Sequence, residues 1–328
     1  MITTGLFEEV LMKPAVDGCD KLCIVSGFAT SAMASTHLKK IADAELTLTV
    51  DLIVGMTSLS GIPLTHHKGF QKLTNQDYPG YFQCSYIQVP PPVHSKVYVW
   101  LKNNVPTQAF IGSANYTQAA FGRQKESLAA CDPNLGLDYF NSLSGDTIYC
   151  TNQDAENRIQ IYNDPAETRR PSKALKSDGE AFPDAGMPFG DSSAFPRVCV
   201  SFLANDGTLP QTSGLNWGQR DGREPNQAYI RLPAAVYGSD FFPPIAEQFT
   251  VLTDDNKVLL CARAQENGKA IHTPANNSEI GIYFRQRLDV PLGDPVKKEQ
   301  LEAYGRFDVC FYKIDEETFF MEFSSPLA

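Results

Sequence analysis

A change of pattern near the middle of the chain constrains the fold more than any other feature. Residues 163–196 contain five Pro and three Gly among Ser, Lys, Asp and Glu, with few large apolar side chains. Such a composition is typical of a linker or a long crossover. The sequence therefore predicts two domains, residues 1–165 and 196–328, joined by a linker over residues 166–195.

The first of these domains mixes strand-like and helix-like segments. Residues 46–54 (LTLTVDLIV) alternate at period two, as a strand does. The other strands are expected at 22–28, 82–89, 93–100 and 107–112. Helices are expected at 30–41, 66–74, 134–144 and 154–162. This mixture predicts an α/β layered domain.

The second domain has a mostly β pattern. Short apolar segments separated by turn residues predict strands at 197–203, 228–232, 248–252, 257–263, 307–313 and 318–323. One helix is expected from about Glu279, after Asn277 and Ser278, which favour helix starts. Many short strands with few helices indicate a barrel-like all-β or α+β domain.

Composition excludes several classes of protein. The chain is 42% apolar and 20% charged, which allows sizeable cores. No run of 18 apolar residues occurs, and the N-terminus lacks a secretion signal, so a membrane or secreted protein is disfavoured and a cytoplasmic location is expected. The eight Cys form no CxxC pair, so we expect reduced thiols rather than a zinc site or a disulfide framework.

The charge distribution bears on nucleic-acid binding. The net charge is −10, and residues 177–328 carry 22 acidic against 13 basic residues. A DNA-binding function would therefore depend on local basic clusters rather than on the field of the whole chain.

Residues 93–126 carry the most specific chemical pattern. His94 and Lys96 are two residues apart on an expected strand and should share one face. A hairpin symmetric about Asn103–Asn104 would place His94 opposite Ser113. Asn115 is expected to begin a short helix whose free N–H groups favour an anion.

Together these residue types suit phosphodiester cleavage. Histidine can attack phosphorus and form a covalent intermediate, while a second histidine protonates the leaving oxygen. Lys96 and Asn115 would hold the non-bridging oxygens. Glu126 is the local carboxylate that would orient the nucleophilic ring. This chemistry requires neither a metal nor another cofactor.

The remaining histidines are assigned no catalytic role. His66 and His67 are adjacent and should point apart, so we expect solvated side chains rather than a metal site. His37 is expected on the polar face of a helix, and His272 in a polar loop.

Polar segments of the second domain are rich in groups that bind bases or phosphates. Arg bonds guanine bidentately, and Asn or Gln does the same with adenine. A solvated loop is the alternative for these segments. The residues singled out are Asn216, Trp217, Gln219, Arg220, Arg223, Asn226, Gln227, Arg263, Gln265, Asn267, Lys269 and His272. Arg285 and Arg287 lie at the end of the expected helix.

The order His94-x-Lys96, Gly112-Ser113-Ala114-Asn115 and Glu126 resembles the HxK…GSxN…E motif of the phospholipase D superfamily. The resemblance implies catalytic roles for His94, Lys96, Ser113, Asn115 and Glu126. Leu101 stands where the superfamily usually has Asp, five residues after the Lys. This departure occurs in the restriction-enzyme branch and argues against the lipid-processing branch.

The WGQR segment and NSEIGIYFRQRL resemble the C-terminal domain of NgoFVII-type restriction endonucleases. That family couples a phospholipase-D-like mixed-sheet domain to a B-three-like pseudobarrel, whose two arms enter the DNA major groove. The resemblance places the arms at 213–227 and 264–272. It also implies GC-rich sites such as GCSGC and a separate helicase-like ATPase subunit.

The chain holds one copy of the motif, whereas cleavage needs two histidines. The simplest solution is a homodimer, formed through the nuclease domains, with one site between two copies. The sequence thus predicts a site-specific, metal-independent restriction endonuclease acting on double-stranded DNA. A phospholipase-D-type lipid phosphodiesterase and a DNA-binding module with a vestigial nuclease half are the alternatives.

Overall fold

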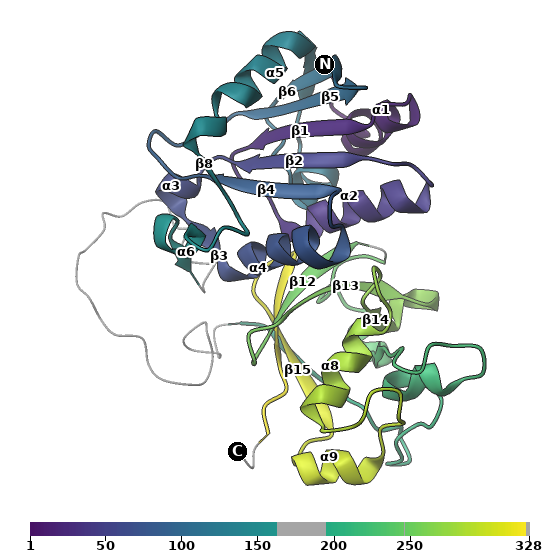
Figure 1. The fold of residues 1–328 in the computed structure, drawn as a ribbon. Helices are drawn as coiled ribbons and strands as arrows, with labels where there is room; N and C mark the ends of the chain where they lie inside the picture. The colour runs from purple at the N-terminus through teal and green to yellow at the C-terminus, as the bar shows by residue number, and fades with distance from the viewer. Residues whose placement is uncertain (163–194, 246, 326–328) are drawn as a thin grey trace. The chain divides into compact units, whose positions relative to one another are not determined.

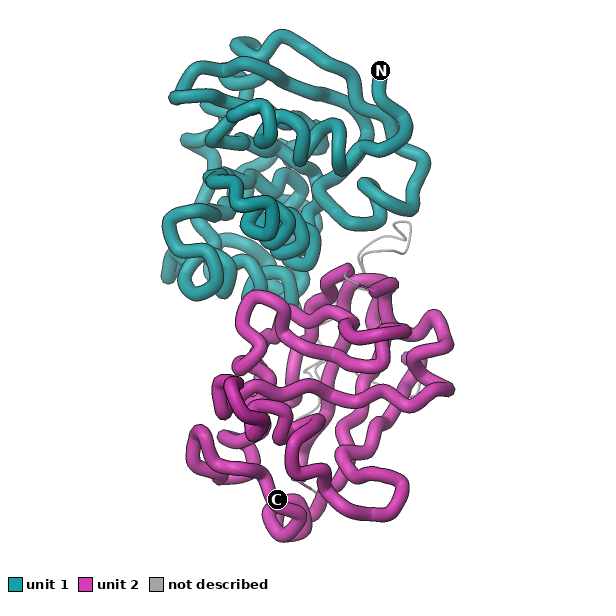
Figure 2. The backbone as a smooth tube through the Cα atoms, turned by 90° about the vertical axis from the view of Figure 1, so that its right-hand side faces the viewer, with its two compact units in different colours: residues 1–163 teal, residues 164–328 magenta. Residues whose placement is uncertain are grey.

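The computed structural model describes residues 1–162, 195–245 and 247–325. The chain divides into two compact units, Met1–Asn163 and Asp164–Ala328 (Figure 2). The predicted linker at 166–195 lies almost wholly outside the described residues. Each unit contains a seven-stranded sheet. Among the helices that the structure describes, none has the length and apolar character needed to span a bilayer.

Unit 1 is built on a mixed sheet with the strand order β7-β6-β5-β1-β2-β4-β8 (Figure 1). β1, β2 and β4 run parallel, and β5 is antiparallel to β1. The strands are β1 (Lys21–Ser26), β2 (Thr49–Val54), β4 (Phe82–Ile87), β5 (Lys96–Lys102), β6 (Val105–Gly112), β7 (Leu128–Cys131) and β8 (Thr147–Tyr149). The α/β expectation is confirmed, although β7 and β8 were not predicted.

Helices pack around this sheet. The longest, α2, begins after Thr30, whose side chain accepts a hydrogen bond from the N–H of Met33 at 3.3 Å and so caps the helix. The helices are η1 (Phe7–Met12), α1 (Lys13–Val16), α2 (Ser31–Asp43), α3 (Thr57–Ser60), α4 (Leu64–Lys72), η2 (Leu73–Asp77), η3 (Ala119–Arg123), α5 (Pro133–Ser142), η4 (Ser144–Asp146) and α6 (Ala155–Arg158). Two short strands, β3 (Ile62–Pro63) and β9 (Ile161–Tyr162), pair separately. The helix expected at 154–162 is thus one turn followed by a strand.

The backbone segments at one end of the unit 1 sheet are tied together. The N–H of Gly55, after β2, donates to Ser26 O at 2.8 Å, and the N–H of Val93 donates to Gly55 O at 2.9 Å. A Cβ at Gly55 would collide with the carbonyl oxygen of Val93, so glycine allows this close approach. One end of the sheet therefore brings together the carboxyl ends of β1 and β2 and the residues before β5.

Histidines 37, 66 and 67 are buried, contrary to the prediction of solvated or polar-face side chains. His66 is 6% exposed, and His37 and His67 are fully buried. His37 Nδ1 lies 2.8 Å from Tyr116 Oη, and its Nε2 lies 3.1 Å from Leu11 O. His67 Nδ1 lies 3.0 Å from Tyr86 Oη. Sequence spacing alone did not reveal that α2 and α4 are covered on these faces.

We expect acid to destabilise unit 1 through His37. Burial lowers the pKa of this imidazole to about 4, below the unfolded value of about 6.5. The unfolded chain therefore binds a proton that the fold excludes, and stability is full above about pH 6.5 and falls as the pH approaches 4. The loss should reach about 3 kcal/mol. Urea unfolding between about pH 7 and pH 4.5 measures it, and His37→Gln should show a flatter dependence on pH. Equal pH dependence in the two proteins would contradict the assignment.

Unit 2 is a nearly closed sheet with the strand order β10-β15-β16-β12-β13-β14-β11. Its edge strands β10 and β11 contact one another. The strands are β10 (Arg197–Ser201), β11 (Ile230–Arg231), β12 (Gln248–Thr253), β13 (Val258–Ala264), β14 (Ala270–His272), β15 (Asp308–Lys313) and β16 (Thr318–Glu322). The barrel-like expectation is confirmed, with β14 as an additional strand.

The core of unit 2 is rich in phenylalanine. The buried ring of Phe242 lies at its centre, with its centroid 5.1–5.5 Å from those of the buried Phe249, Phe311 and Phe319. The helices and turns around this core are η7 (Gly214–Gln219), α7 (Ala234–Tyr237), η8 (Glu266–Gly268), α8 (Glu279–Arg287) and α9 (Lys298–Tyr304).

Arg285 and Arg287 of α8 are structural rather than DNA-facing. Arg285 is fully buried and donates to Asp294 O at 2.9 Å and Pro225 O at 3.2 Å. Arg287 donates two hydrogen bonds to the Asp254 carboxylate, at 2.6 and 2.8 Å, and these bonds raise the pKa of Arg287 further. These two side chains therefore support the fold of unit 2.

One cysteine pair departs from the expected reduced state. Cys199 of β10 and Cys310 of β15 are directly opposite in the antiparallel ladder and form a disulfide. Asp308 lies near the same two sulfurs. Because the sulfurs are bonded to each other, they do not offer thiolates to a metal here. No sequence pattern predicts this pairing, since the two residues are 111 positions apart.

Candidate functional site

His94 and Lys96 lie together at the edge where β1 and β2 end. Lys96 Nζ lies 3.1 Å from His94 Nε2 and donates to His94 O at 2.6 Å. His94 is exposed in the segment just before β5, whereas Lys96, the first residue of β5, is 6% exposed. The imidazole is thus open to a ligand and the ammonium approaches it from the protein side.

The hairpin that carries these residues has a different register from the predicted one. A bulge between Trp100 and Leu101 shifts β5 against β6, so that Val97 pairs with Ile111. Continuing this ladder places Ser113 beside Ser95 rather than opposite His94. The symmetric hairpin omitted the extra residue that the bulge accommodates close to Pro106.

Asn115 faces the histidine from the loop after β6. Its Oδ1 accepts a hydrogen bond from the N–H of Phe28 at 3.1 Å and lies 3.4 Å from Ser26 Oγ. The prediction that Asn115 begins a helix is wrong, because η3 starts only at Ala119. The side-chain amide, rather than a helix N-terminus, is what this loop offers to an anion.

Ser113 and Glu126 form the opposite side of the cluster. The Ser113 hydroxyl donates to Glu126 Oε2, and the N–H of Ser127 donates to Ser113 Oγ at 3.1 Å. Burial lowers the pKa of Lys96, and the nearby Glu126 carboxylate opposes this shift. The contact to Ser113 differs from the predicted role of Glu126, which was to orient the His94 ring.

The turn after β1 forms a wall of the site that sequence reasoning missed. A Cβ at Gly27 would lie 2.9 Å from His94 Cδ2 and 3.4 Å from Asn115 Oδ1, so both side chains pack directly on this glycine. Ser26 is fully buried and donates to Phe28 O at 2.6 Å. A glycine directly after a buried strand was the available signal, but only the pairing of β1 with β5 shows what it faces.

This arrangement combines groups that suit a phosphate. An exposed imidazole adjoins an ammonium, a carboxamide and a hydroxyl that is hydrogen-bonded to a carboxylate. Ammonium and amide hydrogens are groups that can stabilise negative charge on non-bridging oxygens, and an exposed imidazole is a group that can attack phosphorus or carry a proton.

An apolar surface adjoins this cluster in unit 1. Ile111, Leu135 and Tyr139 are 46%, 69% and 36% exposed. They line a groove that also includes Ser95, the residue between His94 and Lys96. Because Ser95 and Val97 alternate with Lys96 along the chain, this groove lies on the α5 face of the sheet, at the same end of β5 as the candidate site.

In unit 2, the two predicted DNA arms leave the same edge of the sheet. The segment 213–227 precedes β11, and the segment 264–272 connects β13 to β14 and includes β14. β11 pairs with β14, so that Ile230 lies opposite Ile271. The pairing brings together two segments that are far apart in the sequence.

Two of the predicted base-reading residues are structural. Asn216 is 2% exposed; its amide donates to Val296 O and accepts from the N–H of Val296, both at 2.8 Å. Arg263 is 8% exposed and donates to backbone carbonyls, including Tyr237 O at 2.6 Å and Gly268 O at 3.1 Å. Burial lowers the pKa of Arg263. Both predictions are corrected: these side chains hold the arms in shape.

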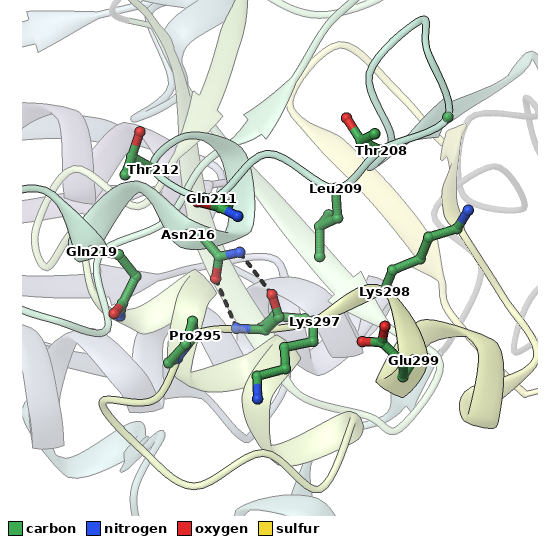
Figure 3. Close-up of a pocket in the computed structure, with 12 residues that line it drawn as sticks. Thr208, Leu209, Gln211, Thr212, Asn216, Gln219, Pro295, Lys297, Lys298 and Glu299 are labelled. Atoms are coloured by element: carbon green, nitrogen blue, oxygen red, sulfur yellow. Dashed lines mark hydrogen bonds between the residues drawn. The ribbon is translucent and has the colours of Figure 1, made fainter.

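Asn216 also borders a cavity of about 660 Å³ beside the first arm (Figure 3). Gln219 and Lys297 are among the residues that line it. Gln219 donates to Pro225 O and Gly293 O, both at 3.1 Å. Its amide nitrogen is therefore engaged with the backbone of the arm.

Several other arm residues remain accessible. Arg220, Arg223, Gln265, Asn267 and Lys269 are exposed, and Trp217, Asn226, Gln227 and His272 are half-buried. Arg223 stacks over the Trp217 ring at 3.8 Å and donates to Gln227 Oε1 at 3.1 Å. The Asn226 amide donates to Glu224 at 2.8 Å, and His272 Nδ1 lies 2.8 Å from Asn277 Oδ1. Contrary to the prediction of a loop, His272 belongs to a strand.

Comparison with solved structures finds distant likenesses to part of the chain. NucT from Helicobacter pylori is 14% identical to this chain, with a TM-score of 0.32. The match covers 45% of this chain and 96% of the NucT chain. Polyphosphate kinase from Porphyromonas gingivalis is 15% identical, covers 46% of this chain and 24% of its own, and has a TM-score of 0.30. No curated protein matches the chain.

Family comparison covers both units. Residues 4–157 match the NgoFVII restriction endonuclease N-terminal PLD domain, and residues 192–315 match the NgoFVII C-terminal B3-like DNA-binding domain. The first match includes the His94–Lys96 cluster, and the second includes both arms. The chain therefore belongs to the NgoFVII restriction endonuclease family, with a phospholipase-D-like nuclease domain followed by a B3-like DNA-binding domain.

Proposed function

We propose that this protein hydrolyses DNA phosphodiester bonds at a specific, GC-rich site through a phosphohistidine intermediate and without a divalent metal. The contact of Lys96 Nζ with His94 Nε2, at 3.1 Å, carries the proposal, because it places a phosphate-binding cation beside an accessible nucleophile. The match of the same chain to a DNA-binding domain supports DNA as the substrate.

The proposed reaction has two steps. A bond forms from an imidazole nitrogen of His94 to phosphorus, and the bond from phosphorus to the leaving oxygen of DNA breaks. A second imidazole gives that oxygen a proton. Water then attacks phosphorus, the second imidazole takes a proton from it, and the bond to His94 breaks. Lys96 and Asn115 bind the non-bridging oxygens throughout.

The second imidazole comes from another copy of the chain in this proposal. The motif occurs once, and the exposed Ile111, Leu135 and Tyr139 give the surface beside the site an apolar character. A second copy related by a two-fold axis would cover this surface and bring its own His94 to the phosphate. A separate helicase-like ATPase subunit, expected from the family resemblance, is a further proposed partner.

Cleavage in EDTA tests the function. Mixed-sequence double-stranded DNA is incubated with the full-length protein in EDTA, with and without host lysate as a source of an ATPase subunit, and the cut ends are mapped. We expect cuts at one short sequence. Cutting that occurs only when magnesium is added to the purified protein would contradict the histidine mechanism.

The arms are proposed to read the site. We expect Arg223→Ala, in the first arm, and Lys269→Ala, in the second, each to weaken binding to the specific site about tenfold, within the 1–3 kcal/mol typical of base contacts. Lys257→Ala is the matched control, because Lys257 is exposed just before β13, at the end opposite to the second arm. Fluorescence anisotropy measures the affinities, and an equal loss in the control would contradict the assignment.

The salt dependence of binding should be shallow. Residues 177–328 carry nine more acidic than basic residues, so few phosphates are neutralised and base contacts must supply much of the affinity. A salt titration of the same complex measures the slope of log affinity against log salt. A slope typical of about eight or more phosphate contacts would contradict this expectation.

A further inference from the structure

A large aromatic side chain is exposed beside the nucleophile. Phe28 follows β1 and is 43% exposed. Its ring meets the His94 ring edge-to-face, with the centroids 6.1 Å apart and the planes at 78°. Leaving apolar ring surface in water forgoes the stabilisation that burial would bring. The position of this ring therefore calls for an explanation beyond folding.

The backbone holds Phe28 in place from both sides. Its N–H donates to Asn115 Oδ1 at 3.1 Å, and its carbonyl accepts from the buried Ser26 hydroxyl at 2.6 Å. The preceding Gly27 packs against His94 and Asn115 without space for a side chain. The Phe28 ring therefore extends from the same turn that packs against His94 and Asn115.

The reach of the ring matches the chemistry of the substrate. A phosphodiester carries a sugar and a base on each side, so a ring about 6 Å from the nucleophilic imidazole lies within range of the adjoining nucleoside. Bases stack on exposed aromatic side chains with little regard to sequence. A hydrophobic ring offers nothing to the phosphate itself.

Building on the proposed nuclease function, we propose that Phe28 is a substrate-contacting residue whose ring stacks on the nucleobase next to the scissile phosphate. Because the faces of a paired base are covered by its neighbours, that base leaves the helical stack when it meets Phe28. The turn Ser26–Phe28 therefore binds the nucleoside, while His94, Lys96 and Asn115 act on the phosphate.

Kinetics with altered protein and altered DNA test this contact. Phe28→Leu removes the ring and keeps apolar bulk, and Phe28→Trp keeps an aromatic face. Tyr81→Leu is the matched control, because Tyr81 is 49% exposed and precedes β4, at the opposite end of the parallel strands from Phe28, which follows β1. The substrates are the duplex that carries the recognised site and the same duplex with an abasic nucleotide beside the scissile phosphate.

We expect Phe28→Leu to raise KM for the intact duplex about tenfold, within the range known for base–aromatic stacking. For the wild type, KM should be higher for the abasic duplex than for the intact duplex by a similar factor. For Phe28→Leu, KM should be the same for both duplexes. Phe28→Trp and Tyr81→Leu should resemble the wild type.

Several outcomes would overturn the proposal. If the wild type cleaves DNA and Phe28→Leu has the same KM, the stacking contact is excluded while the nuclease function stands. An equal fall in kcat on the intact and the abasic duplex, with KM unchanged, would show that the ring only orients His94. Light scattering that finds Phe28→Leu monomeric and the wild type dimeric would make Phe28 an interface residue.

The contact is also measured without cleavage, so that its failure is separate from failure of the nuclease function. Binding of the intact and abasic duplexes is compared between His94→Ala and the double variant His94→Ala/Phe28→Leu. The same pattern of non-additive losses is expected in Kd. Additive losses would contradict stacking whatever the wild type does to DNA.

Discussion

His94→Ala should abolish DNA cleavage, with a loss of roughly 10⁴-fold or more, while specific binding is retained. The reason is chemical: in the proposed mechanism His94 forms the bond to phosphorus, and Lys96 Nζ, 3.1 Å from His94 Nε2, binds the phosphate oxygens beside it. Binding should be unaffected because the arms lie in the other unit. Single-turnover cleavage and anisotropy with the same duplex measure the two effects.

The same variant tests whether two copies share a site. If they do, a mixed dimer of wild type and His94→Ala holds only one of the two imidazoles, and activity should fall toward zero as excess variant is mixed with a fixed amount of wild type. Independent sites would keep the activity of every wild-type chain. If the wild-type chains retain their activity after complete subunit exchange, the shared-site proposal is contradicted. Full activity of His94→Ala on its own would contradict the histidine mechanism.

Gly27→Ala should lower kcat about 100-fold without unfolding the protein. The added methyl group would lie 2.9 Å from His94 Cδ2 and 3.4 Å from both His94 Cα and Asn115 Oδ1. Since the His94 backbone is among these neighbours, rotation of the imidazole alone does not relieve the contact. Displacement of a catalytic group by about 1 Å costs about 10²-fold in rate.

Gly145→Ala is the matched control for this substitution. A Cβ at Gly145 meets nothing within 4 Å, and the residue lies in η4, away from the cluster. In the control we expect the kcat and the free energy of unfolding of the wild type. In Gly27→Ala we expect a free energy of unfolding, measured by urea denaturation, within about 1 kcal/mol of the wild type. A kcat of Gly27→Ala within threefold of the wild type would show that the turn does not position His94.

The chemical content of the site was predictable from spacing. His94 and Lys96 are two residues apart, and this period alone places both side chains on one face of an extended segment. The structure brings them to 3.1 Å, although His94 precedes the strand. The alternation of patterns on either side of residues 163–196 likewise predicted an α/β domain and a mostly β domain, because periodicity is a local property.

The environment of each side chain was not predictable in the same way. Arginine and asparagine are residue types that often contact DNA. In this structure, however, the side chains of Arg263, Arg285 and Asn216 donate hydrogen bonds to backbone carbonyls of distant segments. Asn115 was expected at a helix start that the structure places four residues later. A bulge also shifted the hairpin register. Each miss concerns partners that come from other parts of the chain.

The sequence by itself determined which reactive groups this protein has and the local periodicity that pairs His94 with Lys96. Only the tertiary structure decided that Ser26, Gly27 and Phe28 join them, since the turn after β1 reaches His94 through the pairing of β1 with β5. It likewise decided which arginines are buried and which face solvent. The physical reason is that periodicity is fixed by the geometry of neighbouring residues, whereas burial and long-range pairing minimise the free energy of the whole chain.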